Sequence, residues 1–207
     1  TINLQSNNLV YQDTGNLDID GNTLTLEGTG RFQNTGNLRF NNANSKLTIS
    51  NASTIDKITT GANVNSGKGL DIDDSCTITS LTVTNDLPVD IASGKTVNSG
   101  SGAKDISLDS SGDLQFESSG GGGTWGGSND TIDLNGGTLT VSKTMTIASK
   151  FTVNDDSTIG IANGVTLTAN NSTDVNIGPN TLTIESAGTG TQGGKITPSF
   201  DIKFDNA

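Results

Sequence analysis

Acidic side chains are the residues of this chain whose type and spacing suggest chemistry. They occur as close groups in segments rich in turn-forming residues: Asp18 and Asp20, then Asp71, Asp73 and Asp74, then Asp155 and Asp156. Two carboxyl groups held at a defined separation across a cleft can hydrolyse a glycosidic bond. Hard oxygen ligands in loops also bind Ca²⁺. The sequence therefore raises two hypotheses, a polysaccharide-degrading enzyme and a calcium site.

The rest of the composition argues against both. The chain contains no His, the commonest general base, and only two Arg. Asp side chains also cap turns by hydrogen-bonding to the nearby backbone. We favour that interpretation, because no aspartate group follows the Gly-Gly-x-Gly-x-Asp pattern of calcium-binding β-rolls. We expect no enzyme and no cofactor, and keep Asp71, Asp73, Asp155 and Asp156 as weak calcium candidates.

The chain contains a single Cys and a single Trp, and either side chain could react with or bind a ligand. Cys76 is the single cysteine, so no disulfide forms within the chain. It shares a face with Ile78, which predicts a buried small hydrophobe rather than a reactive thiol. Trp125 lies in the Gly-rich segment 120–127. It is the candidate ligand contact, because Trp is enriched at interaction hot spots, or it folds back over apolar surface.

Both ends of the chain carry apolar residues that can mediate assembly. Phe200, Ile202 and Phe204 alternate with polar residues near the C-terminus, and Ile2 and Leu4 do so near the N-terminus. Such residues either cap the end of a fold or add a strand to the next subunit. They are the candidate assembly or capping residues.

Short β-strands are the elements that must position these residues. The apolar residues are nearly all Ile, Leu and Val, and they alternate with polar residues at the period of a strand. Similar segments repeat along the chain, so that Leu17 and Leu38 are 21 residues apart and Leu24 and Leu47 are 23 apart. Fixed periods of about 20 to 50 residues are typical of repeat architectures.

Asp-Gly and Asn-Gly pairs at 20–21, 135–136 and 163–164 indicate tight corners between the strands. Frequent corners predict a three-sided coil in which each strand pairs with its equivalent one turn later. We predict a single all-β domain over 1–207, a parallel β-solenoid of about 10 turns of about 21 residues with little or no α-helix. A Gly- and Ser-rich loop or hinge is expected at about 98–130, and capping or exchanged strands at 1–12 and 198–207.

The charge and hydropathy of the chain limit its partners. The net charge of −11 disfavours nucleic acid, whose phosphates require Lys and Arg, and anionic membrane surfaces. Only 30% of the residues are hydrophobic, and no apolar run reaches membrane-spanning length. We therefore expect no nucleic-acid binding and no membrane insertion, and an extracellular or cell-surface location.

Thr-x-Thr pairs recur, for example at 138/140, 166/168 and 181/183. On β-helical ice-binding proteins such pairs stack on one face, turn after turn. The steps from 138 to 166 and from 166 to 181 match neither one turn nor two, so these pairs should lie on different faces. Thr is in any case a favourable outward residue of a strand.

The segments Thr-Leu-Thr-Val at 138–141 and Thr-Leu-Thr-Ile at 181–184, with Asn and Gly at the corners, carry a resemblance. The chain resembles the right-handed parallel β-helices of autotransporter passenger domains and filamentous-haemagglutinin-like adhesins. That likeness implies secretion and a surface role. We expect an extracellular structural protein, a subunit that assembles with itself into a filament, sheath or surface layer. The alternative is an adhesin that binds a cell-surface glycan, followed by an ice-binding protein or a polysaccharide-degrading enzyme.

Overall fold

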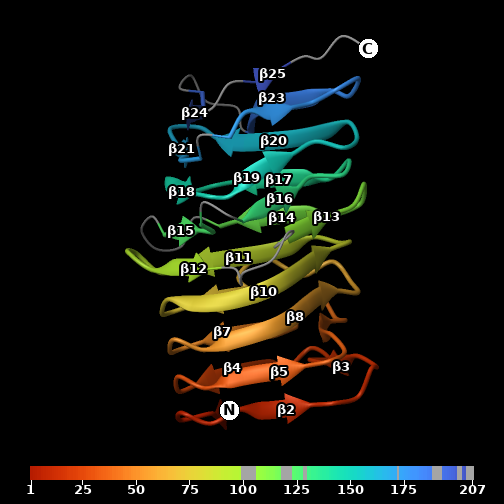
Figure 1. Cartoon of the computed structure of the whole chain (residues 1–207), viewed down its shortest axis with the longest axis vertical. Coiled ribbons are helices and arrows are strands. Elements are labelled where there is room, and N and C mark those ends of the chain that lie inside the picture. The colour runs from red at the N-terminus through yellow and green to blue at the C-terminus, as the bar shows by residue number, and fades with distance from the viewer. Residues whose placement is uncertain are drawn as a thin grey trace.

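The computed structural model describes residues 1–98, 106–117, 123–127, 130–171, 173–187, 193–199 and 202–203. Within these residues the chain winds as a parallel β-solenoid of short strands, without a helix. Figure 1 shows the circuits of the chain stacked along one axis, with the two termini at opposite ends of the stack. The predicted all-β solenoid is confirmed.

Each circuit of the chain, here called a coil, contributes a strand to three faces. Face A is a nine-stranded parallel sheet. Its strands in stacking order are β1 (Ile2–Asn3), β4 (Thr23–Glu27), β7 (Lys46–Ile49), β9 (Gly69–Ile72), β11 (Leu87–Ile91), β14 (Asp113–Phe116), β17 (Thr138–Val141), β20 (Ser157–Ala162) and β23 (Leu182–Ala187).

Faces B and C share two long strands, β8 (Thr54–Thr60) and β10 (Cys76–Val83), whose first halves lie on face B and second halves on face C. Face B also holds β2 (Leu9–Tyr11), β5 (Arg31–Asn34), β12 (Thr96–Asn98), β15 (Thr124–Trp125), β18 (Met145–Ile147), β21 (Thr166–Ala169) and β24 (Lys195–Pro198). Face C holds β3 (Leu17–Asp18), β6 (Leu38–Phe40), β13 (Ile106–Leu108), β16 (Thr131–Asp133) and β19 (Lys150–Thr152), followed by the pair β22 (Val175–Asn176) and β25 (Ile202–Lys203). The predicted three-sided coil is therefore present.

The register of the strands agrees with the repeats seen in the sequence. Leu17 pairs with Leu38, and Leu24 pairs with Leu47. The length of a coil varies more than expected, however. The coil between β9 and β11 is short, since Ile72 pairs with Ile91, whereas the next coil is much longer, since Val89 pairs with Phe116. The coils are on average longer than predicted, so the stack has fewer turns than predicted.

A continuous column of aliphatic side chains fills the inside of the solenoid. On face A, Leu26, Ile49, Ile72 and Ile91 lie in register in four successive coils, and none is more than 1% exposed. Burial of one such side chain stabilises the fold by about 1.5–3 kcal/mol. Each coil thus depends on the coils above and below it for its core, as in other repeat proteins.

Tight turns at the predicted Asp-Gly and Asn-Gly pairs form several corners. Asn135 and Gly136 both have positive φ angles, 34° and 84°, and Asp20 and Gly21 have 48° and 73°. Two consecutive residues with positive φ suit a tight turn that matches the twist of strands, and Asn, Asp and Gly adopt this conformation most readily. These pairs let the chain change face within a few residues.

The segment 98–130 was expected to form a loop or hinge. Its described residues instead include β13, β14 and β15, which pair with strands on both sides of them in the stack. Residues 99–105, 118–122 and 128–129 of this segment lie outside the described residues. The described part of the segment therefore belongs to the wall of the coil.

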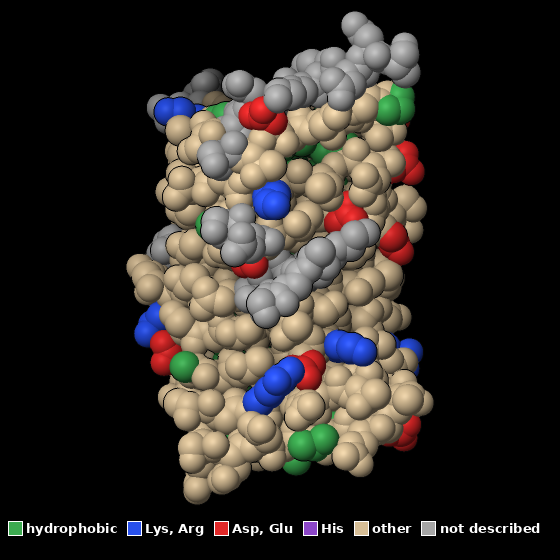
Figure 2. Space-filling model, viewed as in Figure 1, with side chains coloured by type: hydrophobic (Ala, Val, Ile, Leu, Met, Phe, Trp, Pro, Cys, Tyr) green, Lys and Arg blue, Asp and Glu red, His purple; other side chains and the backbone are tan. Residues whose placement is uncertain are grey.

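The outer wall is mainly polar. On the side drawn in Figure 2, hydrophobic side chains occur as isolated spots, and acidic and basic side chains are scattered among them. Outward positions of the strands are rich in Thr, as on β17 and β21. This wall provides no broad apolar surface on the side shown, so the ends of the stack become the regions of interest.

Candidate functional site

The first coil presents unpaired strand edges at the N-terminal end of the stack. Among the described strands, β1 pairs with β4 alone, β2 with β5 alone and β3 with β6 alone. The other edge of each strand therefore has backbone N–H and C=O groups without a strand partner. Such edges are templates for pairing with another chain.

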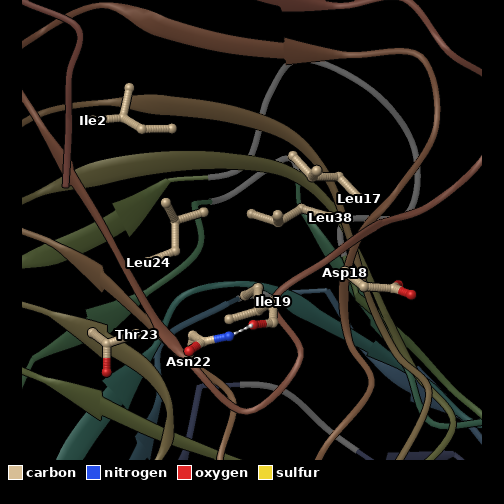
Figure 3. Close-up of a pocket in the computed structure, with 8 residues that line it drawn as sticks. All are labelled: Ile2, Leu17, Asp18, Ile19, Asn22, Thr23, Leu24 and Leu38. Carbon is tan, nitrogen blue, oxygen red and sulfur yellow. Dashed lines mark hydrogen bonds between the residues drawn. The ribbon is translucent and has the colours of Figure 1, made fainter.

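An apolar hollow opens beside these edges. It has a volume of about 260 Å³. In Figure 3, Ile2 and Leu24 point into it from one side, and Leu17 and Leu38 from the other. The side chains of Ile2, Leu17 and Leu24 are only partly buried, whereas Leu38, which pairs with Leu17 from the second coil, is fully buried. The core column is thus open to solvent at this end.

An acidic group lies at the rim of the hollow. Asp18 accepts hydrogen bonds from Arg39 Nε and Nη2 at 2.7 and 2.8 Å. These bonds lower the pKa of Asp18, so its carboxylate stays ionised at neutral pH. Residues 1–30 contain four acids and no Lys or Arg. The N-terminal end is therefore apolar at its centre and acidic around it.

The C-terminal end shows the same kind of exposure. In the described part of the chain β23 pairs with β20 alone, and β24 with β21 alone. Ile184 of β23 points inward, in register with Ile159, yet it is 40% exposed. Exposed large hydrophobic side chains in the described residues are Leu9 at 38%, Val10 at 48% and Ile184, which all lie in the first or last coil. Apolar exposure is concentrated at the two ends.

The predicted assembly residues divide between described and undescribed positions. Ile2 lines the hollow. Leu4, which follows β1 in the first coil, is buried at 4% exposure. Ile202 belongs to β25, whose backbone pairs with β22. Phe200 and Phe204 lie outside the described residues. Whether the last strand caps or extends the coil stays a prediction.

Trp125, the candidate ligand contact, lies inside the coil. Its side chain is 2% exposed, and its ring meets that of Phe116 edge to face, with 5.6 Å between the centroids. Aromatic pairs in this geometry stabilise a core. The ring has no exposed face for stacking on a sugar, so the structure corrects the ligand-contact hypothesis in favour of the apolar-cover alternative.

The calcium candidates Asp71 and Asp73 do not form a metal site with their neighbours. Asp71 forms an ion pair with Lys46 at 2.7 Å. Partial desolvation and the Asp71 charge raise the pKa of Asp73, and Lys46 opposes this shift. Across the described residues, no cluster of three or more His, Cys, Asp or Glu side chains is arranged to hold a metal ion.

The other candidates, Asp155 and Asp156, cap a corner. Asp155 Oδ1 accepts a hydrogen bond from the N–H of Asp156 at 2.8 Å, and its backbone oxygen accepts one from Ser157 Oγ at 2.7 Å. Asp156 Oδ1 accepts a hydrogen bond from the N–H of Thr181 in the next coil at 2.6 Å. These contacts are those of the turn-capping interpretation.

Cys76 is buried at 3% exposure, on the inner side of β10. Burial, with a smaller effect of the Asp74 charge, raises the pKa of its thiol to about 12. A thiol that stays protonated is a poor nucleophile. The buried-hydrophobe interpretation of Cys76 agrees with this geometry.

The three Thr-x-Thr pairs considered above do not form one rank. The pairs at 138/140 and 181/183 belong to face A, and the pair at 166/168 belongs to face B. A rank of single Thr residues does run along face B. Its members, in register over successive coils, are Thr96, Thr124, Thr146, Thr168 and Thr197. Two residues before this rank, Thr144 and Thr166 are in register, so paired Thr stack over two coils, and Lys195 takes the place of Thr in the next coil. The positions two residues after the rank include Asn98, Asn170 and Ser199, so paired Thr do not extend along the whole face.

Comparisons with known proteins leave the family open. No family model matches the chain, and neither the search of curated proteins nor that of solved structures found a match. The resemblance to autotransporter passengers and haemagglutinin-like adhesins therefore stays a prediction, although the parallel β-solenoid itself is present. Within the described residues there is also no helix long and apolar enough to cross a membrane.

Some features of the ends had no clear signal in the sequence. Leu17 and Leu24 read as ordinary inward strand residues, and their exposure follows from their place in the first two coils. Ile184 likewise belongs to a strand with the same pattern as β17, whose Leu139 and Val141 are fully buried. An inward residue is exposed or buried according to whether another coil lies on each side of it, which the local sequence pattern does not show.

Proposed function

We propose that this protein is an extracellular structural protein, a subunit that assembles with itself into a filament, sheath or surface layer. Copies of the solenoid join end to end through β-strand contacts. The observation that carries the proposal is the exposure of Leu9 and Ile184 in the first and last coils, because both point inward, in register with the buried Phe32 and Ile159.

We expect self-assembly because each end of the solenoid combines unpaired backbone edges with exposed apolar side chains. Among the described strands, the outer edges of β1 and β23 carry backbone donors and acceptors without strand partners. The core column is exposed at the hollow beside β1 and at Ile184 of β23. Adding another coil pairs the edge and buries the apolar side chains in one step, as in strand addition. The polar wall, with a net charge of −11 on the chain, disfavours association side by side.

The alternative of a glycan-binding adhesin has less support. It assigned binding to the segment 98–130 and named Trp125 as the candidate contact, and the ring of Trp125 is buried against Phe116. The proposal of self-assembly does not depend on this residue.

The test uses a charge placed in the predicted contact. Ile184→Asp puts a carboxylate at an inward but 40% exposed position of the last coil. Thr82→Asp is the matched control, because it adds the same charge at an outward, exposed position of β10, in the middle of the stack and away from both ends. Burying an unpaired charge is costly, so we expect Ile184→Asp to raise the concentration needed for assembly at least tenfold. Thr82→Asp should change it little.

Sedimentation velocity and negative-stain microscopy measure the outcome, and circular dichroism verifies that both variants fold. Wild-type protein should form particles longer than one stack. A wild type that stays monomeric at every concentration tested would refute the proposal. So would Ile184→Asp protein that assembles at wild-type concentrations.

A further inference from the structure

We infer that the joint between subunits is head to tail, with the N-terminal coil of one copy seated on the C-terminal coil of a second copy. This inference rests on the proposed function and identifies the partner of the open N-terminal end. It predicts an open, polar filament, because a head-to-tail contact repeats without closing.

Strand direction favours this arrangement. Neighbouring strands run parallel on all three faces, as in the pairs β1–β4, β2–β5 and β3–β6. A copy stacked head to tail continues the three faces in the same order and direction. Two N-terminal ends related by a two-fold axis would pair strands antiparallel and would place face B against face C. These faces differ at the first coil, since β2 has three residues and β3 has two.

The shapes of the two ends also differ. The N-terminal end has the hollow of about 260 Å³ between Ile2, Leu17 and Leu24. The C-terminal end presents Ile184 at an inward position. Head to tail, with inward residues opposite inward residues, Ile184 or its neighbour Leu182 lies opposite Ile2 at the hollow, and the apolar side chains of both ends become buried. Two N-terminal ends in contact would enclose two hollows, and empty apolar space destabilises a contact.

Charge gives an independent reason. Residues 1–30 carry Asp13, Asp18, Asp20 and Glu27 without any Lys or Arg, and because Arg39 of the second coil neutralises Asp18, the acidic excess of this end comes from Asp13, Asp20 and Glu27. Two such ends in contact would place like charges together, which costs free energy. The C-terminal coil carries Lys195, which is exposed on β24, as well as Glu185 on β23. The acidic N-terminal end therefore fits the C-terminal end better than a second copy of itself.

In a parallel strand, alternate residues direct their backbone N–H and C=O groups to opposite edges, and this alternation indicates which face carries the joint. The N–H of Leu4 bonds to Glu27 O, so the neighbouring Asn3 directs its backbone groups to the free edge of β1. Ser157 N donates to Thr181 O, so Leu182 and Ile184 direct theirs to the free edge of β23. These two edges on face A can form a complete parallel ladder, with Asn3 opposite Thr183 or Glu185.

Face B is less suited to such a ladder. Lys195 N and Ser199 N donate to the preceding strand, so Ile196 and Pro198 face the free edge of β24. Proline has no N–H, and it is found at sheet edges for that reason. The edge of β24 therefore lacks one donor, and the ladder of the joint is expected on face A.

Disulfide trapping tests the polarity. Asn3→Cys and Thr183→Cys, with Glu185→Cys for the second possible register, place thiols at exposed outward positions on the two edges. The native Cys76 is buried and its thiol pKa is about 12, so it does not compete. Under mild oxidation, a mixture of Asn3→Cys protein with one of the other two variants should yield several-fold more covalent dimer than any variant alone. A chain carrying both cysteines should yield a ladder of covalent polymers.

Each other result has a defined meaning. Covalent dimers of Asn3→Cys alone, at a yield equal to or above the mixture, would show head-to-head contacts and overturn the inference while self-assembly stands. Assembly by sedimentation without any trapped product would place the joint away from face A and would also overturn it. Monomers in every sample, without cross-links, would refute the proposed function itself.

Discussion

Lys143 and Asp90 form an ion pair across an intervening coil. The Nζ–Oδ1 distance is 2.6 Å although 53 residues separate the two, and Lys143 also donates to Ile91 O at 2.9 Å. Lys143 follows β17 and Asp90 belongs to β11, so the pair spans the coil of β14. The Lys143 side chain is 4% exposed and that of Asp90 28%. A buried ammonium group therefore depends on a partly solvated carboxylate.

This asymmetry gives a prediction on stability. Asp90→Asn removes the carboxylate that forms an ion pair with the buried Lys143 ammonium group, which should lower the free energy of unfolding by about 3 kcal/mol. Lys143→Met leaves a carboxylate that water can reach, and should lower it by about 1–2 kcal/mol. Urea denaturation followed by circular dichroism measures both. The control is Lys46→Met, which removes the more exposed Lys46–Asp71 pair and should cost less than about 1 kcal/mol. Equal effects of all three variants would contradict this account.

Asn34 makes a second prediction, because its buried side chain joins two coils. Its Nδ2 donates to Gly36 O and Lys57 O at 2.7 Å each, and its Oδ1 accepts from Lys57 N at 3.2 Å. Asn34→Ala leaves buried backbone groups unsatisfied and should cost about 2–4 kcal/mol. Asn37→Ala, in the same coil, removes an exposed bond to Asn16 and should cost about 0.5 kcal/mol or less. A shift of the urea midpoint that is the same for both would argue against the role of Asn34.

The burial of Cys76 leads to two predictions, a loss of stability at high pH and a low reactivity of the thiol in the folded protein. Its folded-state pKa of about 12 is above the ordinary value of 9.0, so the unfolded chain loses this proton first. The stability that this group contributes is therefore complete below pH 9 and declines as the pH rises from 9 toward 12. Native protein at pH 8 should react with a thiol reagent far more slowly than urea-unfolded protein. Rapid labelling of the folded chain would be inconsistent with burial.

Asp113 predicts the opposite effect at acidic pH. Burial raises the pKa of this carboxyl, although hydrogen bonds from Gln115 and Thr140, both 2.9 Å long, act against the shift. A raised pKa means that the ionised form destabilises the fold near neutral pH. This cost declines as the pH falls below the folded pKa and is gone below the ordinary value of 3.8. Asp113→Asn should therefore stabilise the protein at pH 7 by up to about 1 kcal/mol. The gain should vanish at low pH, and a loss of stability at pH 7 would contradict the predicted sign.

Much of the fold could be predicted from the residues. The alternation of Leu, Ile and Val with polar residues specified the inward side of each strand, and the spacing of Leu24 and Leu47 specified their pairing. The length of each coil could not be predicted as well. Corners differ in length because any insertion that stays outside the core is tolerated, as between β11 and β14, where the coil is longer than its neighbours on either side along face A.

The candidate sites were less predictable. Trp125 follows a run of glycines, which indicates a loop, but its burial depends on Phe116, which meets it from another face of the coil. Lys143 has an ordinary sequence context, and its burial follows from a contact 53 residues away. The exposed apolar residues of the ends were partly anticipated through Ile2, since an end coil always lacks one neighbour. The hollow itself depends on four strands, β1, β3, β4 and β6, that meet only in the folded solenoid.

The parallel stacking of the three faces has a consequence for how the chain can be made. Each later strand of face A pairs with the strand made one coil earlier, as Ile91 pairs with Ile72 and Phe116 with Val89. Each new coil thus finds its template already formed, and no distant segment has to return to close a sheet. A chain that emerges N-terminus first, from a ribosome or through a narrow export pore, can fold vectorially, one coil at a time. Each added coil then resists backward sliding of the chain without any energy source other than its own burial.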